Sequence, residues 1–223
     1  MADVKAHVQD APWPQAVFSY SSEDKASYYD GRLFGIWYKE YQHHLCAFGE
    51  VQHLFRERML SSRQIPHSGR VKNTFYFHEF YMGTQYLKAG YDVLFYARKV
   101  EDSECYEIAS ELLGGGDAAQ FIFPNSEEGG RAPDLLVFDR CTKRVRFVEC
   151  KGKYEPFTKK QIGRFIEIES YLKRTSTASA LFDPLYEHNL FPPVSEGQWI
   201  HIARLRPKSP NASPIWSKAA TTR

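Results

Sequence analysis

Two short apolar segments joined by only five residues constrain the fold of this chain more than any other feature. The first is DLLVFD, residues 134–139, and the second is VRFVECK, residues 145–151. Branched and aromatic residues favour extended structure, and the connection from Arg140 to Arg144 has the length of a hairpin loop. The sequence therefore predicts two neighbouring antiparallel strands.

Helical and extended patterns surround this hairpin. In chain order, the predicted elements are a helix over 73–89 that Asn73 caps and Gly90 ends, a strand over 91–97, a short helix over 104–113, the hairpin, a helix over 158–173 and a strand over 199–205. Strands that alternate with helices in this way indicate an α/β protein with one sheet flanked by helices.

The segments that flank this core match no motif. Residues 1–20 contain two prolines and little periodicity, so we expect a poorly ordered or loosely docked arm. Residues 24–60 carry apolar side chains at three- and four-residue spacing, which predicts helix. We divide the chain into a helical extension (1–72), a core (73–206) and a flexible basic tail (207–223). The extension is available for substrate recognition, a lid or a homodimer contact.

The charge balance is nearly neutral, with 29 Lys and Arg against 27 Asp and Glu and a net charge of +2. This balance disfavours a protein that holds nucleic acid by bulk positive charge alone. The charges are segregated, however, because residues 101–129 hold eight acids and no base, and residues 200–223 hold five bases and no acid. Any affinity for nucleic acid should therefore come from local basic patches and weaken with salt.

Cysteine usage and hydropathy indicate an intracellular protein. The four cysteines form no CxxC pair, which disfavours a disulfide framework. No apolar run approaches the roughly 18–20 residues of a membrane helix, and the first residues lack the apolar segment of a signal peptide. We expect a cytoplasmic, nucleoid or nuclear protein without a membrane partner, and signal-independent export stays open as an alternative.

The hairpin brings three charged residues together. Asp134 opens the first strand and Glu149 and Lys151 close the second, and these ends are adjacent in an antiparallel pair. Side chains alternate along a strand, so Glu149 and Lys151 share a face and the Cys150 side chain packs on the opposite one. The alternatives are that Asp134 is only a turn residue after Pro133, and that Glu149 and Lys151 form a weak ion pair on an exposed strand.

Two carboxylates on adjacent strands suit a hard cation. Mg²⁺ takes oxygen ligands and keeps several waters, so Asp134 and Glu149 can hold it without caging it, assisted by the backbone carbonyl of Cys150. Mn²⁺ should substitute for it. A bound metal polarises a phosphoryl oxygen and activates a water, which Lys151 can orient while stabilising the developing charge. The cluster therefore predicts metal-dependent phosphodiester cleavage.

The literal pattern PD…ExK, formed by Pro133, Asp134, Glu149 and Lys151, resembles the motif of the PD-(D/E)XK nuclease superfamily. The longer run over 129–165 is most similar to its virus-type replication-repair nuclease branch, known as VRR-Nuc. Two departures are a slightly longer gap between Gly130 and Pro133 and a cysteine, Cys150, at a position that is usually aliphatic.

This resemblance covers about residues 73–205. It implies a restriction-endonuclease-like core with the order α-β-β-β-α-β and a mixed sheet flanked by helices. It also implies a Mg²⁺-dependent deoxyribonuclease, an endonuclease of DNA repair that acts on double-stranded or branched DNA and leaves a 5′-phosphate. RNA stays open as an alternative substrate.

The resemblance further implies roles for Glu79 and Gln161. The family often has a glutamate on its first core helix, where Glu79 would reach the metal through water or help bind a second ion. Many members have a glutamine early in the helix after the ExK strand, where Gln161 would position the water or a phosphate. The residues alone leave Glu79 as a solvated side chain and Gln161 as the partner of Thr158 in a capping box. We expect that one rotamer of Gln161 cannot fill both roles.

Basic residues near the same edge are candidates for contacts with the nucleic-acid backbone or are simply solvated; they are Arg131, Lys153, Lys159, Lys160 and Arg164. Two further functions remain alternatives to a DNA-cleaving enzyme. One is a nuclease-fold module that binds DNA or a protein without cleavage. The other is a nuclease toxin or effector that a regulatory protein partner controls.

Overall fold

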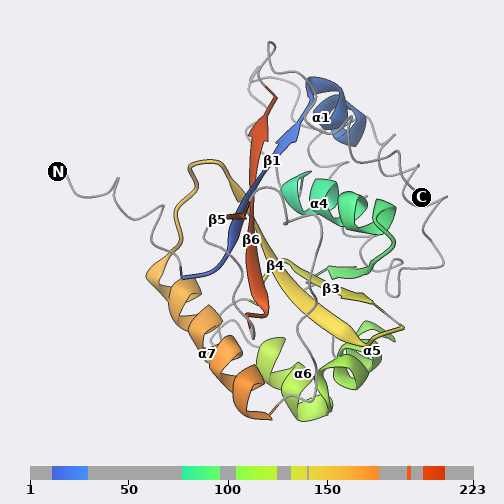
Figure 1. The fold of residues 1–223 in the computed structure, drawn as a ribbon, viewed down its shortest axis with the longest axis vertical. Helices are drawn as coiled ribbons and strands as arrows, with labels where there is room; N and C mark the ends of the chain where they lie inside the picture. The colour runs from blue at the N-terminus through green and yellow to red at the C-terminus, as the bar shows by residue number, and fades with distance from the viewer. Residues whose placement is uncertain are drawn as a thin grey trace, which may run out of the picture.

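The computed structural model describes residues 12–29, 77–95, 104–124, 132–139, 141–175, 190–191 and 198–208. Its elements are β1 (Gln15–Tyr20), α1 (Ser22–Tyr29), α4 (Phe77–Lys88), β2 (Asp92–Phe95), α5 (Glu104–Leu113), α6 (Gly116–Ile122), β3 (Leu135–Asp139), β4 (Arg144–Gly152), α7 (Lys159–Thr175), β5 (Leu190–Phe191) and β6 (Ile200–Pro207). Figure 1 shows the strands at the centre of the molecule with helices around them.

The strands form one sheet of six in the order β2-β3-β4-β6-β1-β5. The pairs β2–β3 and β3–β4 are antiparallel, whereas β4–β6 and β6–β1 are parallel. The short strand β5 pairs antiparallel with β1. The predicted class, an α/β protein with a mixed sheet flanked by helices, is confirmed.

Alternating side chains supply a hydrophobic core on each face of the sheet. One cluster joins α4 to the sheet and includes Phe80, Met82 and Val148. The cluster on the other face joins α5, α6 and α7 to the sheet and includes Phe147 and Phe165 (Figure 1). Phe147 and Val148 are neighbours in β4, so their opposite placement follows directly from the period of two in a strand.

The predicted hairpin is present, and its turn shows why the chain reverses there. The carboxylate of Asp139 accepts hydrogen bonds from the backbone N–H groups of Cys141 (2.8 Å) and Thr142 (3.3 Å). Lys143 takes a positive φ of 54° to complete the turn. The predicted end of α4 is also confirmed, because Gly90 has a φ of 88° directly after the helix.

The expectation of a loose arm over residues 1–20 is wrong for Gln15–Tyr20, which form β1 in the interior of the sheet. Trp13, just before the strand, is only 2% exposed, and its ring centroid lies 5.4 Å from that of Phe165. The strand was missed because its partner β6 is far away in sequence and local periodicity carries no sign of that pairing. Pro14 precedes the strand, where the missing N–H is tolerated.

A second difference is α6, a helix over Gly116–Ile122 that we did not predict. Gly114 and Gly115 have φ values of 90° and 141°, so these glycines end α5 as predicted, but the next helix begins at once. The predicted helix start at Asn73, most of the helical segment 24–60 and the tail after Lys208 lie outside the described residues. Among the helices that are described, none has the length and apolarity needed to cross a membrane.

Candidate active site

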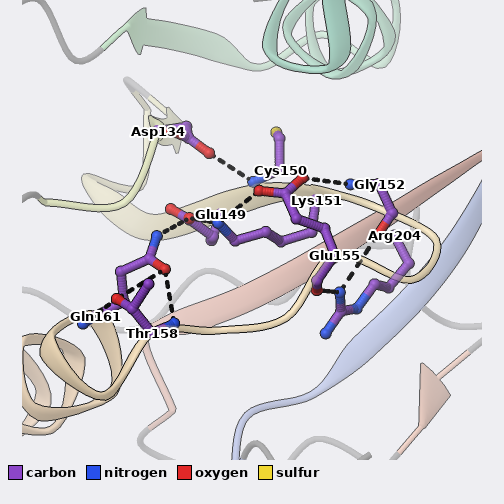
Figure 2. A network of polar contacts seen from close by, with 9 residues as sticks. All are labelled: Asp134, Glu149, Cys150, Lys151, Gly152, Glu155, Thr158, Gln161 and Arg204. Atoms are coloured by element: carbon purple, nitrogen blue, oxygen red, sulfur yellow. Dashed lines mark hydrogen bonds and ion pairs between the residues drawn. The ribbon is translucent and has the colours of Figure 1, made fainter. Parts of the chain in front are cut away.

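The candidate site lies where β3 begins and β4 ends. The last paired position of these strands is Leu135 with Val148, and β4 continues to Gly152 beyond it. Asp134 immediately precedes β3, and its Oδ2 accepts a hydrogen bond from the backbone N–H of Cys150 at 2.8 Å (Figure 2). The predicted convergence of Asp134 with the ExK segment is therefore present.

Cys150 contributes its backbone to this edge and its side chain to the core. The N–H and C=O of a strand residue point to the same neighbouring strand. Because the N–H of Cys150 points to Asp134, its carbonyl faces the same gap beyond the start of β3. The side chain is 6% exposed and belongs to the cluster under α4, as predicted.

Glu149 and Lys151 are paired inside the protein. Lys151 Nζ lies 3.0 Å from Glu149 Oε1, and the two residues are 5% and 3% exposed. This burial rules out the alternative of an ordinary exposed strand with a weak surface pair. A buried charged pair is costly unless its remaining hydrogen-bonding positions are filled, so their other partners matter.

Gln161, at the start of α7, supplies one of those partners. Its Oε1 accepts a hydrogen bond from the Thr158 backbone N–H (3.1 Å), and the Thr158 hydroxyl accepts one from the Gln161 N–H (3.1 Å). The same side chain donates from Nε2 to Glu149 Oε1 at 3.0 Å (Figure 2). One rotamer of Gln161 therefore serves the capping box through Oε1 and holds Glu149 through Nε2, and its predicted role in positioning a water or a phosphate stays a prediction.

Glu155 is a site residue that sequence reasoning missed. It accepts a hydrogen bond from Lys151 Nζ (3.1 Å) through Oε1 and one from the Gly152 N–H (3.1 Å) through Oε2. Lys151 is thus held between two carboxylates, Glu149 on the strand and Glu155 on the following turn. The only local signal was the four-residue spacing from Lys151 across Gly152, which is too common to identify such a contact.

Arg204 of β6 stabilises that turn through hydrogen bonds to its backbone. Its guanidinium donates to the backbone carbonyls of Gly152 (3.4 Å) and Glu155. Its Nε donates to Gln15 Oε1 at 3.0 Å, which ties the turn to β1. The Phe157 ring lies 5.1 Å from the guanidinium and 5.6 Å from Lys151 Nζ.

The carboxyl groups at this edge hold their protons more tightly than usual. Burial, opposed by the Cys150 N–H and the Lys151 charge, raises the pKa of Asp134 to about 6. Burial and then the charge of Asp134 raise the pKa of Glu149 well above its ordinary range. On α4, burial and the charge of Asp134 raise the pKa of Glu79 to about 8.

Lys151 keeps its charge in this setting. Burial alone lowers the pKa of an ammonium group, but the charges of Glu149 and Glu155 outweigh that effect and the net pKa is raised. The site therefore combines carboxyl groups that favour protons with an ammonium group that stays positive. Such opposed shifts in one place are typical of functional sites.

Only some of the predicted basic residues are available to a ligand. Arg164 is wrong as a phosphate contact, because it is 6% exposed and donates to the backbone carbonyls of Phe121 and Ile122, with the latter at 3.5 Å. Its guanidinium instead links α7 to α6 through these hydrogen bonds. Exposed bases at this edge are Lys153, Lys159 and Lys160, and Arg131 lies outside the described residues.

Within the described ranges, no group of three or more His, Cys, Asp or Glu side chains is arranged to hold a metal ion. The oxygen donors at the site are thus a pair of carboxylates, a backbone carbonyl and the more peripheral Glu79. Comparison with known proteins adds no assignment, since no family model, curated protein or solved structure matches this chain.

Proposed function

We propose that this protein is a metal-dependent nuclease, an endonuclease that hydrolyses DNA phosphodiester bonds. The observation that carries the proposal is the buried assembly of Asp134, Glu149 and Lys151 at one edge of the sheet. Burying charged groups costs free energy, and a purely structural role would be met more cheaply by apolar side chains. A function that needs these charges accounts for the cost.

The order of the elements supports the same proposal. When α5, α6 and β5 are set aside, the remaining elements run α4-β2-β3-β4-α7-β6, with two antiparallel pairs followed by a parallel one, and this order is consistent with the α-β-β-β-α-β core that the PD…ExK resemblance implies. The PD segment precedes β3, the ExK segment ends β4, and Gln161 opens α7 beside them. The described elements outside that core are β1, α1, α5, α6 and β5.

The donor set fits a hard divalent cation such as Mg²⁺ or Mn²⁺. Asp134 and Glu149 offer carboxylate oxygens, the Cys150 carbonyl faces the same gap, and Glu79 lies close enough to Asp134 for their charges to interact. Burial raises the pKa of Asp134 and Glu149, and the charge of Asp134 adds to this effect at Glu149, so a bound cation would favour the ionised carboxylates. When bound, the metal would supply Lewis-acid activation of a phosphate oxygen and of a water.

The residues of the chain have distinct roles in this proposal. Lys151 is held by Glu149 and Glu155 with its charge retained, so it can orient the attacking water and stabilise negative charge on the phosphate. Gln161 fixes Glu149 in position. The water oxygen bonds to phosphorus as the bond between phosphorus and the 3′-oxygen breaks; the water loses a proton, the leaving 3′-oxygen gains one, and by family analogy the products carry a 5′-phosphate and a 3′-hydroxyl. Lys153, Lys159 and Lys160 are the candidates for backbone contacts.

A cleavage assay tests this proposal. Purified full-length protein is incubated with supercoiled, linear, branched and single-stranded DNA, and with RNA, in Mg²⁺, Mn²⁺ or EDTA. Glu149→Gln and Lys151→Met keep the approximate shape of the site, and Glu111→Gln is a matched control at an exposed ion pair with Lys143 on the far turn of the hairpin. We expect cleavage that EDTA abolishes, that both site variants lose by at least about 100-fold, and that the control retains.

Cleavage that survives EDTA, or that both site variants retain, would overturn the assignment. Tight binding without cleavage of any substrate would instead identify the second candidate, a nuclease-fold module that grips DNA or a protein partner. A regulatory partner or a homodimer would appear as a change of activity or mass when a second component or more protein is added.

A further inference from the structure

An exposed aromatic ring lies on the turn that follows the ExK segment. Tyr154 lies on the turn after β4 and is 73% exposed, more than the other exposed large apolar residues of the described chain, Val17 (40%) and Ile166 (50%). Aromatic side chains normally bury much of their surface, so a ring left in solvent has a face ready for a flat ligand.

The turn that carries Tyr154 is firmly held. The Glu155 N–H donates to the Gly152 carbonyl at 3.0 Å, and the Glu155 carboxylate accepts from the Gly152 N–H at 3.1 Å. Arg204 donates to backbone carbonyls on both sides of the turn (Figure 2). A ligand that stacks on Tyr154 therefore pays little entropy for ordering the backbone.

Tyr154 is also close to Lys151 in the chain, and its ring lies beside the ammonium group of Lys153. Tyr154 is three residues beyond Lys151, which limits their Cα separation to about 10 Å. Lys153 Nζ lies 4.5 Å from the centroid of the Tyr154 ring. A ring that accepts a base beside an ammonium that accepts a phosphate is the combination with which proteins bind unpaired nucleotides.

We propose that Tyr154 is a stacking platform for an unpaired nucleobase next to the phosphodiester at the site, with Lys153 on the neighbouring phosphate. The inference rests on the proposed nuclease function and narrows its substrate. Bases inside an uninterrupted duplex already stack on each other, so the platform selects a single strand, a frayed end or a branch point. The base face is common to DNA and RNA, so the ring itself does not select the sugar.

Binding of fluorescent oligonucleotides tests the platform without requiring cleavage. Full-length protein in EDTA is titrated with single-stranded DNA or RNA containing 2-aminopurine, whose emission reports stacking, and with a blunt duplex. The variants are Tyr154→Ala, Tyr154→Trp and Lys153→Met, and Ile166→Ala is the control for loss of an exposed apolar residue on α7. Thermal unfolding verifies that each variant is folded.

We expect Tyr154→Ala to weaken single-strand binding about 5- to 100-fold, the range for one base–aromatic stack, and to remove the change in emission. Tyr154→Trp should restore both, Ile166→Ala should alter neither, and blunt-duplex binding should hardly change. Lys153→Met should lower the dependence of log affinity on log salt by about one.

The inference is overturned if wild type and Tyr154→Ala bind single strands with equal affinity. It is also overturned if Tyr154→Ala weakens binding to the blunt duplex as much as binding to the single strand. The cleavage assay with Glu149→Gln is independent of this result. Stacking without metal-dependent cleavage would support the Tyr154 platform and overturn the nuclease function. Metal-dependent cleavage that Tyr154→Ala does not impair on any single-stranded or branched substrate would support the nuclease function and overturn the platform.

Discussion

Gln161 Nε2 donates a hydrogen bond to Glu149 Oε1 across 3.0 Å, which joins the first turn of α7 to the end of β4. The other end of the same amide caps the helix through Thr158. One side chain therefore couples the geometry of the helix start to the geometry of the candidate site.

The two functions of this amide can be separated by mutation. Thr158→Ala removes the cap hydroxyl and should lower the free energy of unfolding by about 1 kcal/mol while cleavage is retained. Gln161→Ala should cost a similar amount of stability and also reduce cleavage about tenfold or more, because Glu149 loses a charged hydrogen bond. Urea unfolding and initial cleavage rates measure the two effects. Equal cleavage by both variants would show that the contact with Glu149 has no functional role.

Removing the charge of Glu155 should lower the cleavage rate through Lys151 and leave the stability of the fold nearly unchanged. Its side chain is 49% exposed, so Glu155→Gln is expected to change the free energy of unfolding by less than about 1 kcal/mol. Cleavage should fall about tenfold in kcat with little change in KM, because Lys151 loses a charged partner at 3.1 Å. The matched control is Glu167→Gln, which removes a 3.2 Å ion pair with Arg164 on α7. A kcat equal to that of the control would contradict the positioning role.

Glu79 should make the metal-free protein less stable as pH rises. Its pKa is about 8 in the fold against an ordinary 4.5, so the folded protein binds this proton more tightly than the unfolded chain. The stabilisation is complete below about pH 4.5 and is lost as pH rises through about 8, with a slope of at most about 1.4 kcal/mol per pH unit. Glu79→Gln should flatten this part of the curve. Denaturant unfolding in EDTA from pH 5 to 8.5 measures it, and an unchanged slope in the variant would contradict the assignment.

His201 should produce the opposite trend at low pH. The imidazole is 0% exposed, and burial with the nearby Arg146 charge lowers its pKa to about 2 from 6.5. The folded state therefore disfavours protonation, so stability is complete above about pH 6.5 and falls as the pH drops toward 2. At pH 4.5 the loss is about 2–3 kcal/mol relative to pH 7. His201→Phe should remove this acid limb in the same unfolding series, and an acid limb that persists in the variant would assign the loss to other groups.

Local patterns were sufficient wherever the decisive interactions are local. The β3–β4 hairpin, the Thr158 cap that opens α7 and the C-terminal end of α4 depend on residues a few positions apart, and those features were predicted. The meeting of Asp134 with Glu149 also followed, because a short hairpin leaves little choice of which strand ends are adjacent.

The failures concern contacts across long separations or the burial of charged groups. β1 depends on β6, and no property of Gln15–Tyr20 alone reveals that pairing. Arg164 was placed on the surface because it is charged, yet its guanidinium meets the open carbonyls at the end of α6. The contact of Gln161 with Glu149 was not foreseen, and it is possible beside the cap because an amide has a donor end and an acceptor end.

The pairing of β1 with β6 also determines when the site can be completed during synthesis. Ser19 and Arg206 are 187 residues apart and joined by a 3.2 Å hydrogen bond, so β1 must wait for β6 to leave the ribosome, about 10 to 40 s later at ordinary rates of translation. Arg204, which clamps the turn after Lys151, is itself bound to Gln15. A nascent chain thus carries both carboxylates about 3 to 11 s before Arg204, which follows Glu149 by 55 residues, can clamp the turn after Lys151, and completion of the proposed site would be delayed until β6 docks.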